Sequence, residues 1–117
     1  DKEGIPAREL TLMQQRLLEL ARALATEPKL LLLDEIAAGL SLKAVSQLIN
    51  LILALRDQGL TLLLTDHLLN LVVPVSDRLL ALDQGKIIAA GPPQTLIHDP
   101  QVEAAYLGTR EAAGEEG

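Results

Sequence analysis

Two pairs of polar residues that could do chemistry each follow a short apolar run in this 117-residue sequence. Asp34 and Glu35 come after four consecutive leucines, and Asp66 and His67 end a second leucine-rich run. Side chains alternate in direction near a strand end, so one carboxylate can hold a metal, directly or through water, while the other orients or deprotonates a water. A histidine at the end of a second strand can bond a phosphate oxygen or that water. Together these groups suit phosphoryl transfer.

Each pair also has an ordinary structural explanation. A solvated Asp-Glu pair after a buried strand is common, and an isolated histidine after a strand is more often a surface residue. The local patterns therefore leave both explanations open, and the elements that position the pairs have to be considered.

A helix and a strand are expected before the first pair. Thr11 and Gln14 have the spacing of a capping box, which predicts a helix that begins at Thr11 and ends near Pro28. The apolar run Leu30–Leu33 predicts a strand buried on both faces, as in a parallel sheet. The run by itself does not exclude a segment of buried helix.

A second helix and a second strand follow. Ser41 predicts the start of a helix that ends at Gly59, and Leu60–Thr65 predicts the strand. A short apolar helix is expected next, with a break at Pro74. Strand–helix–strand units imply parallel pairing, and ligands of open parallel sheets bind beyond the carboxyl ends of the strands. We therefore expect both polar pairs at one edge of the sheet.

The last third of the chain predicts a hairpin and short helices. Residues 79–82 and 86–90 flank a turn in which Gly85 can take a positive φ. One or two short helices are expected within residues 94–107. The acidic segment 109–117 is expected to be a flexible tail, after a domain that covers residues 1–108.

Composition excludes several classes of protein. The net charge of −6 argues against a nucleic-acid-binding surface, which needs clustered basic residues. The chain has no cysteine, which excludes disulfides and thiolate metal sites. No apolar run approaches the roughly 18 residues of a membrane span, and the polar first residues are not expected to be a signal peptide.

The order and spacing of the motifs resemble the ATPase domain of ABC transporters. Thr65-Asp66-His67 resembles the switch histidine of that family. Three segments resemble its branched-chain amino-acid importer subgroup in particular: residues 37–40, 100–102 and 105–108. The remaining segments, in order, resemble its signature segment and helix, Walker B strand, D-loop and C-terminal hairpin: residues 10–16, 21–24, 30–35, 38–40 and 82–91. The resemblance implies an α/β fold of the P-loop NTPase type, here its C-terminal half, with a mainly parallel sheet flanked by helices and an antiparallel hairpin.

The resemblance also implies roles for single residues. Asp34 would serve Mg²⁺ through water, Glu35 would be the general base for the attacking water, and His67 would contact the γ-phosphate of ATP. Thr11 and Gln14 lie in the signature segment, where a helix N-terminus faces the nucleotide of a second ATPase subunit.

Ser41 is placed by the same resemblance in the D-loop. The implied partners are that second subunit and membrane permease subunits, with no nucleic acid. The implied location is cytoplasmic, at the inner face of the cell membrane.

The sequence departs from the family pattern at several positions. It has no G-x-x-x-x-G-K-[ST] loop, so the chain alone is expected to lack ATPase activity and useful affinity for ATP. Leu12 and Met13 replace a Gly-Gly pair, and a side chain at Met13 falls where the backbone approaches a phosphate. Glycine at this position is therefore expected to raise activity, unless Met13 turns into the core. Ile36, Leu68 and Ser41 are further departures.

Three alternatives remain beside a transport ATPase. One is a degenerate, non-catalytic fragment that acts only as an interaction module, which Met13 favours and which the retained Asp34, Glu35 and His67 oppose. Another is a soluble ABC protein of DNA repair or chromosome structure, which the acidic charge opposes. The last is an unrelated parallel α/β domain with accidental motifs.

Overall fold

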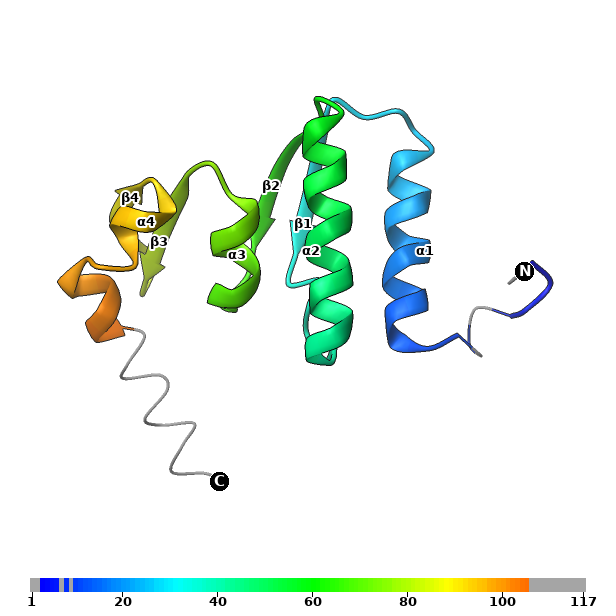
Figure 1. The fold of residues 1–117 in the computed structure, drawn as a ribbon, viewed down its shortest axis with the longest axis horizontal. Helices are drawn as coiled ribbons and strands as arrows, with labels where there is room; N and C mark the ends of the chain where they lie inside the picture. The colour runs from blue at the N-terminus through cyan, green and yellow to red at the C-terminus, as the bar shows by residue number, and fades with distance from the viewer. Residues whose placement is uncertain (1–2, 7, 9, 106–117) are drawn as a thin grey trace, which may run out of the picture. The chain divides into compact units, whose positions relative to one another are not determined.

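The computed structural model describes residues 3–6, 8 and 10–105, and the chain divides into two compact units. The first unit extends to Val75, and the second begins at Ser76. The first unit contains, in chain order, α1 (Leu12–Leu24), β1 (Leu30–Asp34), α2 (Leu42–Asp57), β2 (Thr61–Thr65) and α3 (Leu69–Val75), as Figure 1 shows. The second contains β3 (Leu79–Asp83), β4 (Lys86–Gly91), α4 (Pro93–Leu96) and a helical turn at residues 100–105.

The sheet of the first unit consists of two parallel strands. In its register Leu30 lies opposite Thr61, and Asp34 lies opposite Thr65. The connection between the strands is α2, as parallel pairing requires. The α/β fold with parallel strands at the two leucine-rich runs is thus confirmed, and the carboxyl ends of both strands meet at one edge.

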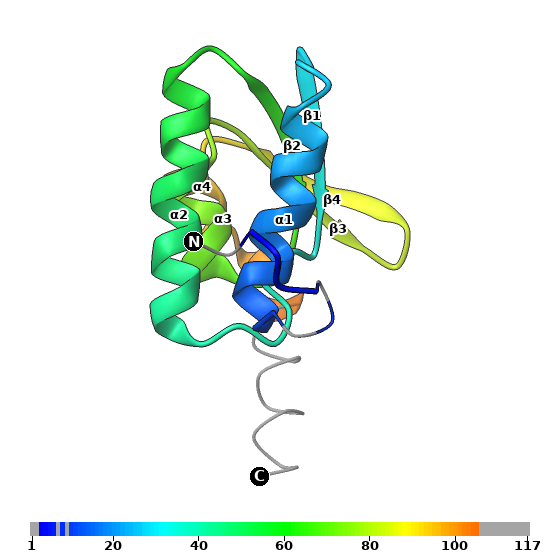
Figure 2. The same ribbon diagram turned by 90° about the vertical axis from the view of Figure 1, so that its right-hand side faces the viewer.

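The core of this unit lies between one face of the sheet and the helices. Leu31 and Leu33 point from β1 into it and are buried. Figure 2 shows α2 along that side of the two strands. The helices and the loop after β1 contribute the other buried members of the cluster, which are Leu20, Ala37, Val45, Leu48, Ile52, Leu55, Leu71 and Val75.

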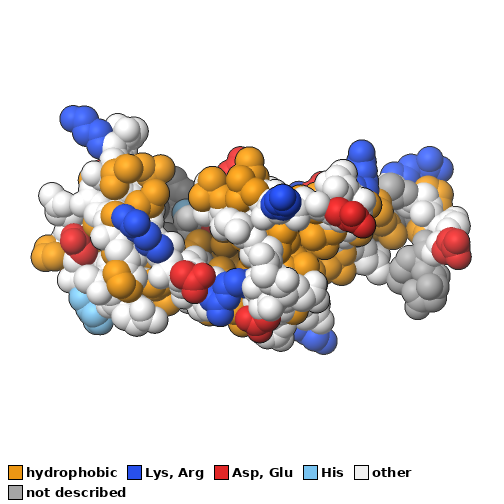
Figure 3. All heavy atoms as spheres, turned by 90° about the horizontal axis from the view of Figure 1, so that it is seen from above, with side chains coloured by type: hydrophobic (Ala, Val, Ile, Leu, Met, Phe, Trp, Pro, Cys, Tyr) orange, Lys and Arg blue, Asp and Glu red, His pale blue; other side chains and the backbone are white. Residues whose placement is uncertain are grey.

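The opposite face of the sheet is open, which corrects the expectation of a strand buried on both faces. Leu30 and Leu32 on β1 are 53% and 64% exposed, and Leu63 on β2 is 56% exposed. The strict alternation along β1 shows that helices cover one side only among the described residues. Figure 3 also shows hydrophobic side chains that reach the surface among charged ones. Parallel sheets ordinarily have both faces covered, so these leucines form a surface suited to a further layer.

Helix starts follow the sequence signals. The Thr11 hydroxyl accepts from the backbone N–H of Gln14, while the Gln14 side chain accepts from the N–H of Thr11, which completes the predicted capping box. The Ser41 hydroxyl accepts from the N–H of Ala44 and caps α2, also as predicted. Both helices therefore begin where their caps place them.

The helix ends agree only in part with those predicted from the sequence. Gly59, with φ +94°, follows the end of α2 as predicted, and α1 ends at Leu24, before Pro28. The predicted break at Pro74 is wrong, because α3 continues through Pro74 to Val75. Proline removes only one backbone donor, and in a helix this short a single missing bond near its end is tolerated. The Arg56 guanidinium donates to the Val75 carbonyl at 3.2 Å, which holds this end of α3 against α2.

The second unit contains the predicted hairpin. β3 and β4 pair antiparallel, and the turn between them has positive φ at Gln84 and Gly85. Two successive residues with positive φ match the right-handed twist of the strands. The helical expectation for residues 94–107 is confirmed in part by α4 and residues 100–105. Residues 106–107 and the tail at 109–117 lie outside the described residues. No helix in the described part of the chain is both long and apolar enough to cross a bilayer.

Candidate functional site

The end of β1 places Asp34 and Glu35 in different backbone conformations. The ladder continues one step beyond β1, since the N–H of Glu35 donates to the Thr65 carbonyl at 2.8 Å. Glu35 itself has φ +49°, a left-handed conformation that is uncommon outside glycine. The chain turns there, and the N–H of Ala38 donates back to the Glu35 carbonyl at 3.3 Å. This sharp turn ends the strand and separates the directions of the two carboxylates.

Asp34 is held by its neighbour on β2. The hydroxyl of Thr65 donates to Oδ1 of Asp34, and the register places these two residues directly opposite each other. Both residues are exposed. One oxygen of Asp34 is therefore oriented by the sheet itself, at the edge where ligands of parallel sheets bind.

His67 lies beside two carboxylates. Its Nδ1 is 3.9 Å from Oε1 of Glu35 and 3.8 Å from Oδ1 of Asp66. The side chains of His67 and Glu35 are 77% and 62% exposed, whereas that of Asp66 is 3% exposed. The structure thus brings together Glu35 and His67, which the sequence placed at the ends of different strands.

Asp66 connects β2 to α3. Its Oδ1 accepts from the N–H of Leu68 at 2.9 Å, and the Leu68 carbonyl then accepts from the N–H of Val72 in α3. Its Oδ2 is buried and has no hydrogen-bond partner in the structure. A buried carboxylate oxygen without a donor is uncommon and costly, so Asp66 is an unusual residue for a simple turn.

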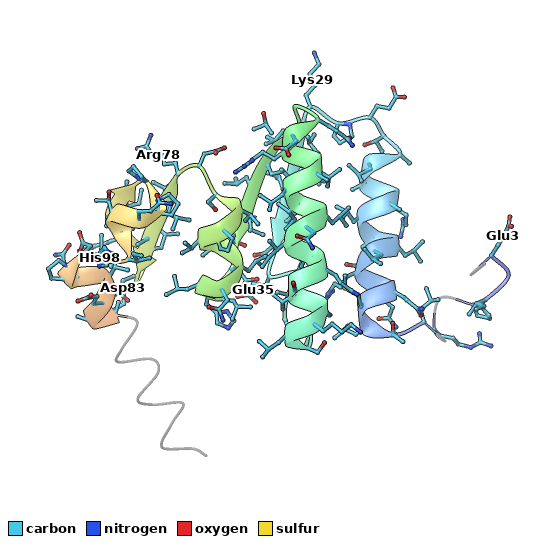
Figure 4. All side chains as sticks on the ribbon, in the orientation of Figure 1. Glu3, Lys29, Glu35, Arg78, Asp83 and His98 are labelled. Atoms are coloured by element: carbon cyan, nitrogen blue, oxygen red, sulfur yellow. The ribbon has the colours of Figure 1, made fainter. Side chains whose placement is uncertain are left out.

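The starts of α1 and α2 lie at the same end of the first unit as Glu35. Figure 4 shows Glu35 at one end of this unit and Lys29, which precedes β1, at the other. The colours of Figure 1 place the N-termini of both helices at the end of Glu35. Thr11, Gln14 and Ser41 therefore lie at the same end of the unit as Glu35, although their side chains are engaged in capping their own helices.

Leu12 and Met13, which replace the Gly-Gly pair of the family, have different surroundings in the structure. Met13 is partly buried and packs against the core. Leu12 is 38% exposed, and its Cδ2 lies 3.0 Å from the point where a Cβ on Gly39 would sit. Gly39 has φ +78° in the loop after β1. Leu12 thus links the start of α1 to this loop, and Met13 is directed toward the core.

The described residues at this edge can act as individual side chains, but they do not form a metal-binding cluster. Among the residues that the structure describes, no group of three or more His, Cys, Asp or Glu side chains could hold a metal ion. A metal here would consequently depend on water or a ligand for most of its coordination, which is how Mg²⁺ is commonly held beside phosphates. The edge offers the carboxylate of Asp34 that Thr65 orients, the carboxylates of Glu35 and Asp66 beside His67, and the imidazole of His67.

Two residues of this edge were not assigned a role from the sequence. Thr65 orients Asp34, and the side chain of Asp66 is only 3% exposed and lies beside His67. The parallel register of the two leucine runs could have pointed to Thr65, because it places that residue opposite Asp34. The burial of Asp66 has no signal in the sequence, since a polar residue after a strand is ordinarily solvated.

Comparisons with curated proteins find several relatives of equal identity. The chain is 43% identical over 103 residues to the "High-affinity branched-chain amino acid transport ATP-binding protein LivG" of Escherichia coli. The aligned residues cover 87% of this chain and 40% of LivG. It is also 43% identical over 95 residues to the "Lipopolysaccharide export system ATP-binding protein LptB" of Haemophilus influenzae, with 81% and 39% covered. No protein-family model matches the chain.

Solved structures that resemble this chain are also ATP-binding proteins of ABC transporters. MJ1267, an ATP-binding cassette of an ABC transporter, aligns with a TM-score of 0.79 at 34% identity, over 87% of this chain and 42% of that one. CbiO1 from Clostridium perfringens aligns with a TM-score of 0.74 at 27% identity, over 86% and 41%. The chain spans about two fifths of the length of the relatives that it matches.

The parallel strands, their connecting helix and the Asp-Glu and histidine strand ends define an α/β domain of the cassette type. The chain belongs to the ATP-binding cassette family of ABC transporters.

Proposed function

We propose that this chain is the C-terminal portion of the ATP-hydrolysing domain of an ABC importer, with residues 1–108 as the cassette portion and 109–117 as a tail. The observation that carries the proposal is the approach of Glu35 to His67, at 3.9 Å, beyond the carboxyl ends of two parallel strands. The open leucine face of the sheet supports a portion of a larger domain, because parallel sheets are covered on both faces.

In this proposal the strand-end residues divide the chemistry among them. Glu35 is the general base that polarises the attacking water, a role that needs an exposed carboxylate within reach of the substrate. His67 contacts the γ-phosphate and lies close enough to Glu35 to share the same water. Positioning and charge stabilisation supply most of the rate in phosphoryl transfer, so this geometry is what the protein has to provide.

Asp34 fits a water-mediated role toward Mg²⁺. It is exposed, one of its oxygens is oriented by Thr65, and no cluster of further ligands surrounds it among the described residues. Mg²⁺ keeps several waters and commonly binds one or two carboxylates together with phosphates of the nucleotide. When bound, the ion neutralises charge on the phosphates, while Asp34 orients its water shell.

The starts of α1 and α2 would face the nucleotide of a second ATPase subunit. The free N–H groups and the dipole of a helix N-terminus favour phosphate. Thr11, Gln14 and Ser41 would act by fixing where these helices begin, since their side chains are engaged in the caps. Membrane permease subunits are the other proposed partners, with the ATPase at the cytoplasmic face of the membrane.

The transported substrate is proposed to be a branched-chain amino acid. The names of LivG and of BraF from Pseudomonas aeruginosa, both 43% identical to this chain, support this class. LptB, which is named for lipopolysaccharide export, has the same identity, so lipopolysaccharide export is the competing assignment. The segments at 37–40 and 100–102 favour the amino-acid importer.

The second candidate function is a non-catalytic interaction module. Leu12 favours it, because its partly exposed side chain stands where the family pattern has glycine, whereas Met13 packs against the core. The 117 residues also contain no phosphate-binding loop, so hydrolysis would need that loop from outside this sequence.

A chimera separates the candidates. The segment of Escherichia coli LivG that matches this chain is replaced by residues 10–108, which supplies the phosphate-binding loop from LivG. We expect the chimera to hydrolyse Mg-ATP and the isolated 117-residue chain to show no micromolar binding of Mg-ATP by calorimetry. A folded chimera that binds ATP without hydrolysing it would favour the interaction module. Restored leucine uptake in cells that lack LivG would support the amino-acid substrate.

A further inference from the structure

We infer that Asp66 is a positioning residue for His67, whose buried carboxylate keeps a proton on Nδ1 of the imidazole. This inference rests on the proposed function for its consequence in catalysis. The geometry behind it, however, is a property of this chain and can be measured without nucleotide.

The hydrogen bond that Asp66 makes does not explain its charge. Oδ1 accepts the N–H of Leu68 at 2.9 Å and so supports the start of α3. Asparagine, serine or threonine provide the same acceptor without burying a charge, and the side chain of Asp66 is only 3% exposed. Its Oδ2 has no hydrogen-bond partner in the structure, which makes the carboxylate a poor choice for stability alone. A role outside the turn accounts for the acidic side chain.

The neighbour that a negative charge would serve is His67. Nδ1 lies 3.8 Å from Oδ1 of Asp66 and 3.9 Å from Oε1 of Glu35, so both carboxylates approach the same ring nitrogen. These distances exceed a direct hydrogen bond and leave room for an electrostatic contact or one bridging water. Of the two, Asp66 is the fixed charge, because it is buried and anchored to Leu68, whereas Glu35 is 62% exposed.

The expected consequence is a particular tautomer. A negative charge near one nitrogen of a neutral imidazole favours the proton on that nitrogen, so His67 should carry its proton on Nδ1. At about 4 Å from a partly shielded charge, the ratio of the two tautomers should change by about three- to tenfold. In the proposed ATPase, Nε2 of this neutral form is an acceptor, so it can accept from the attacking water. It donates to the γ-phosphate only when a second proton makes the ring an imidazolium, which the charge of Asp66 would also stabilise.

The tautomer can be read by NMR in the 117-residue chain. Nitrogen-15 shifts of the imidazoles distinguish the Nδ1–H and Nε2–H forms, and the spectrum is recorded well above the ordinary imidazole pKa of about 6.5. The chain has only two histidines, so His98, in the second unit, is an internal reference. We expect mainly the Nδ1–H form for His67. A predominant Nε2–H form at His67 in the unaltered chain would overturn the inference, whatever the variants do.

Three variants test whether Asp66 is the cause. Asp66→Asn keeps the acceptor for Leu68 but removes the charge, and it should lower the Nδ1–H to Nε2–H ratio of His67 at least threefold. Asp66→Glu keeps the charge and should retain the ratio within about twofold. His98 should not change in either. A purely structural role predicts the reverse, with Asp66→Asn silent, and that result would overturn the inference. A shift in Glu35→Gln without one in Asp66→Asn would do so as well, since Glu35 would then be the sole cause.

The readout is independent of hydrolysis. If the LivG chimera fails to turn over ATP while His67 shows the expected tautomer, the proposed function is wrong and the positioning role of Asp66 stands. If the chimera is active and Asp66→Asn leaves the tautomer unchanged, the proposed function stands and the positioning role fails.

Discussion

Oε1 of Glu35 and Nδ1 of His67 lie 3.9 Å apart, although the two residues follow different strands and α2 separates those strands in the sequence. The parallel register brings them together, because it aligns Asp34 with Thr65 and so ends both strands at one edge. The left-handed conformation of Glu35 then turns the chain immediately after the ladder. The pair is therefore a product of strand register and of one unusual backbone angle.

Removing the charge of Glu35 should abolish most turnover. In the LivG chimera, Glu35→Gln is expected to lower the rate of phosphate release at saturating Mg-ATP by about 10²–10⁴-fold, the range for loss of a general base. Asp57→Asn is the matched control, because Asp57 is an exposed carboxylate at the far end of α2. An active Glu35→Gln chimera would contradict the assignment of the base.

The hydroxyl of Thr65 should matter for Mg²⁺. Thr65→Val removes the donor to Asp34 and is expected to raise the Mg²⁺ concentration for half-maximal turnover of the chimera by about tenfold, as one hydrogen bond to a charged group is worth about 1.5 kcal/mol. Thr65→Ser keeps the hydroxyl and should behave like the unaltered chimera. Equal Mg²⁺ dependence in the valine and serine variants would show that Asp34 needs no such orientation.

The loop after β1 should be sensitive to a methyl group at Gly39. Gly39→Ala must hold alanine at φ +78°, and its Cβ would lie 3.0 Å from Cδ2 of Leu12. The left-handed conformation alone costs roughly 1–2 kcal/mol. Gly59→Ala is the control, with φ +94° and no atom within 4 Å of the added Cβ.

Urea unfolding of the single variants and of the Leu12→Ala/Gly39→Ala double variant measures the contact. We expect a coupling of about 0.5 kcal/mol or more between positions 12 and 39. Additive effects within error would mean that Leu12 moves aside freely and does not fix the start of α1 against this loop.

Glycine at position 13 should lower stability and leave turnover unimproved. Met13 packs against the core, so Met13→Gly removes buried apolar surface and adds a flexible residue to the first turn of α1. A loss of about 1–3 kcal/mol in unfolding free energy is expected, below the full range for a buried methionine because Met13 is only partly buried. Met13→Ala separates the packing loss from the backbone effect of glycine. Higher turnover in a Met13→Gly chimera of unchanged stability would show instead that the side chain obstructs the nucleotide.

The sequence by itself determined the local elements and their order. The capping box at Thr11, the cap at Ser41 and the turn at Gly85 depend on contacts within a few residues, and all three are present in the structure. The ordered motifs determined the family, because a set of short matches at the correct spacing is specific even though each match alone is weak. Pro74 was misjudged because the cost of proline depends on how many backbone bonds a helix of that length would otherwise make.

Only the tertiary structure decided which residues meet and which are buried. The register that puts Thr65 beside Asp34 depends on how two strands align across α2, which no local pattern encodes. The burial of Asp66 depends on its surroundings in the folded unit, and the exposure of Leu30 and Leu32 depends on which side of the sheet the helices cover. Burial is a property of everything that packs around a side chain, so a run of leucines can predict a strand without predicting how many of its faces are covered.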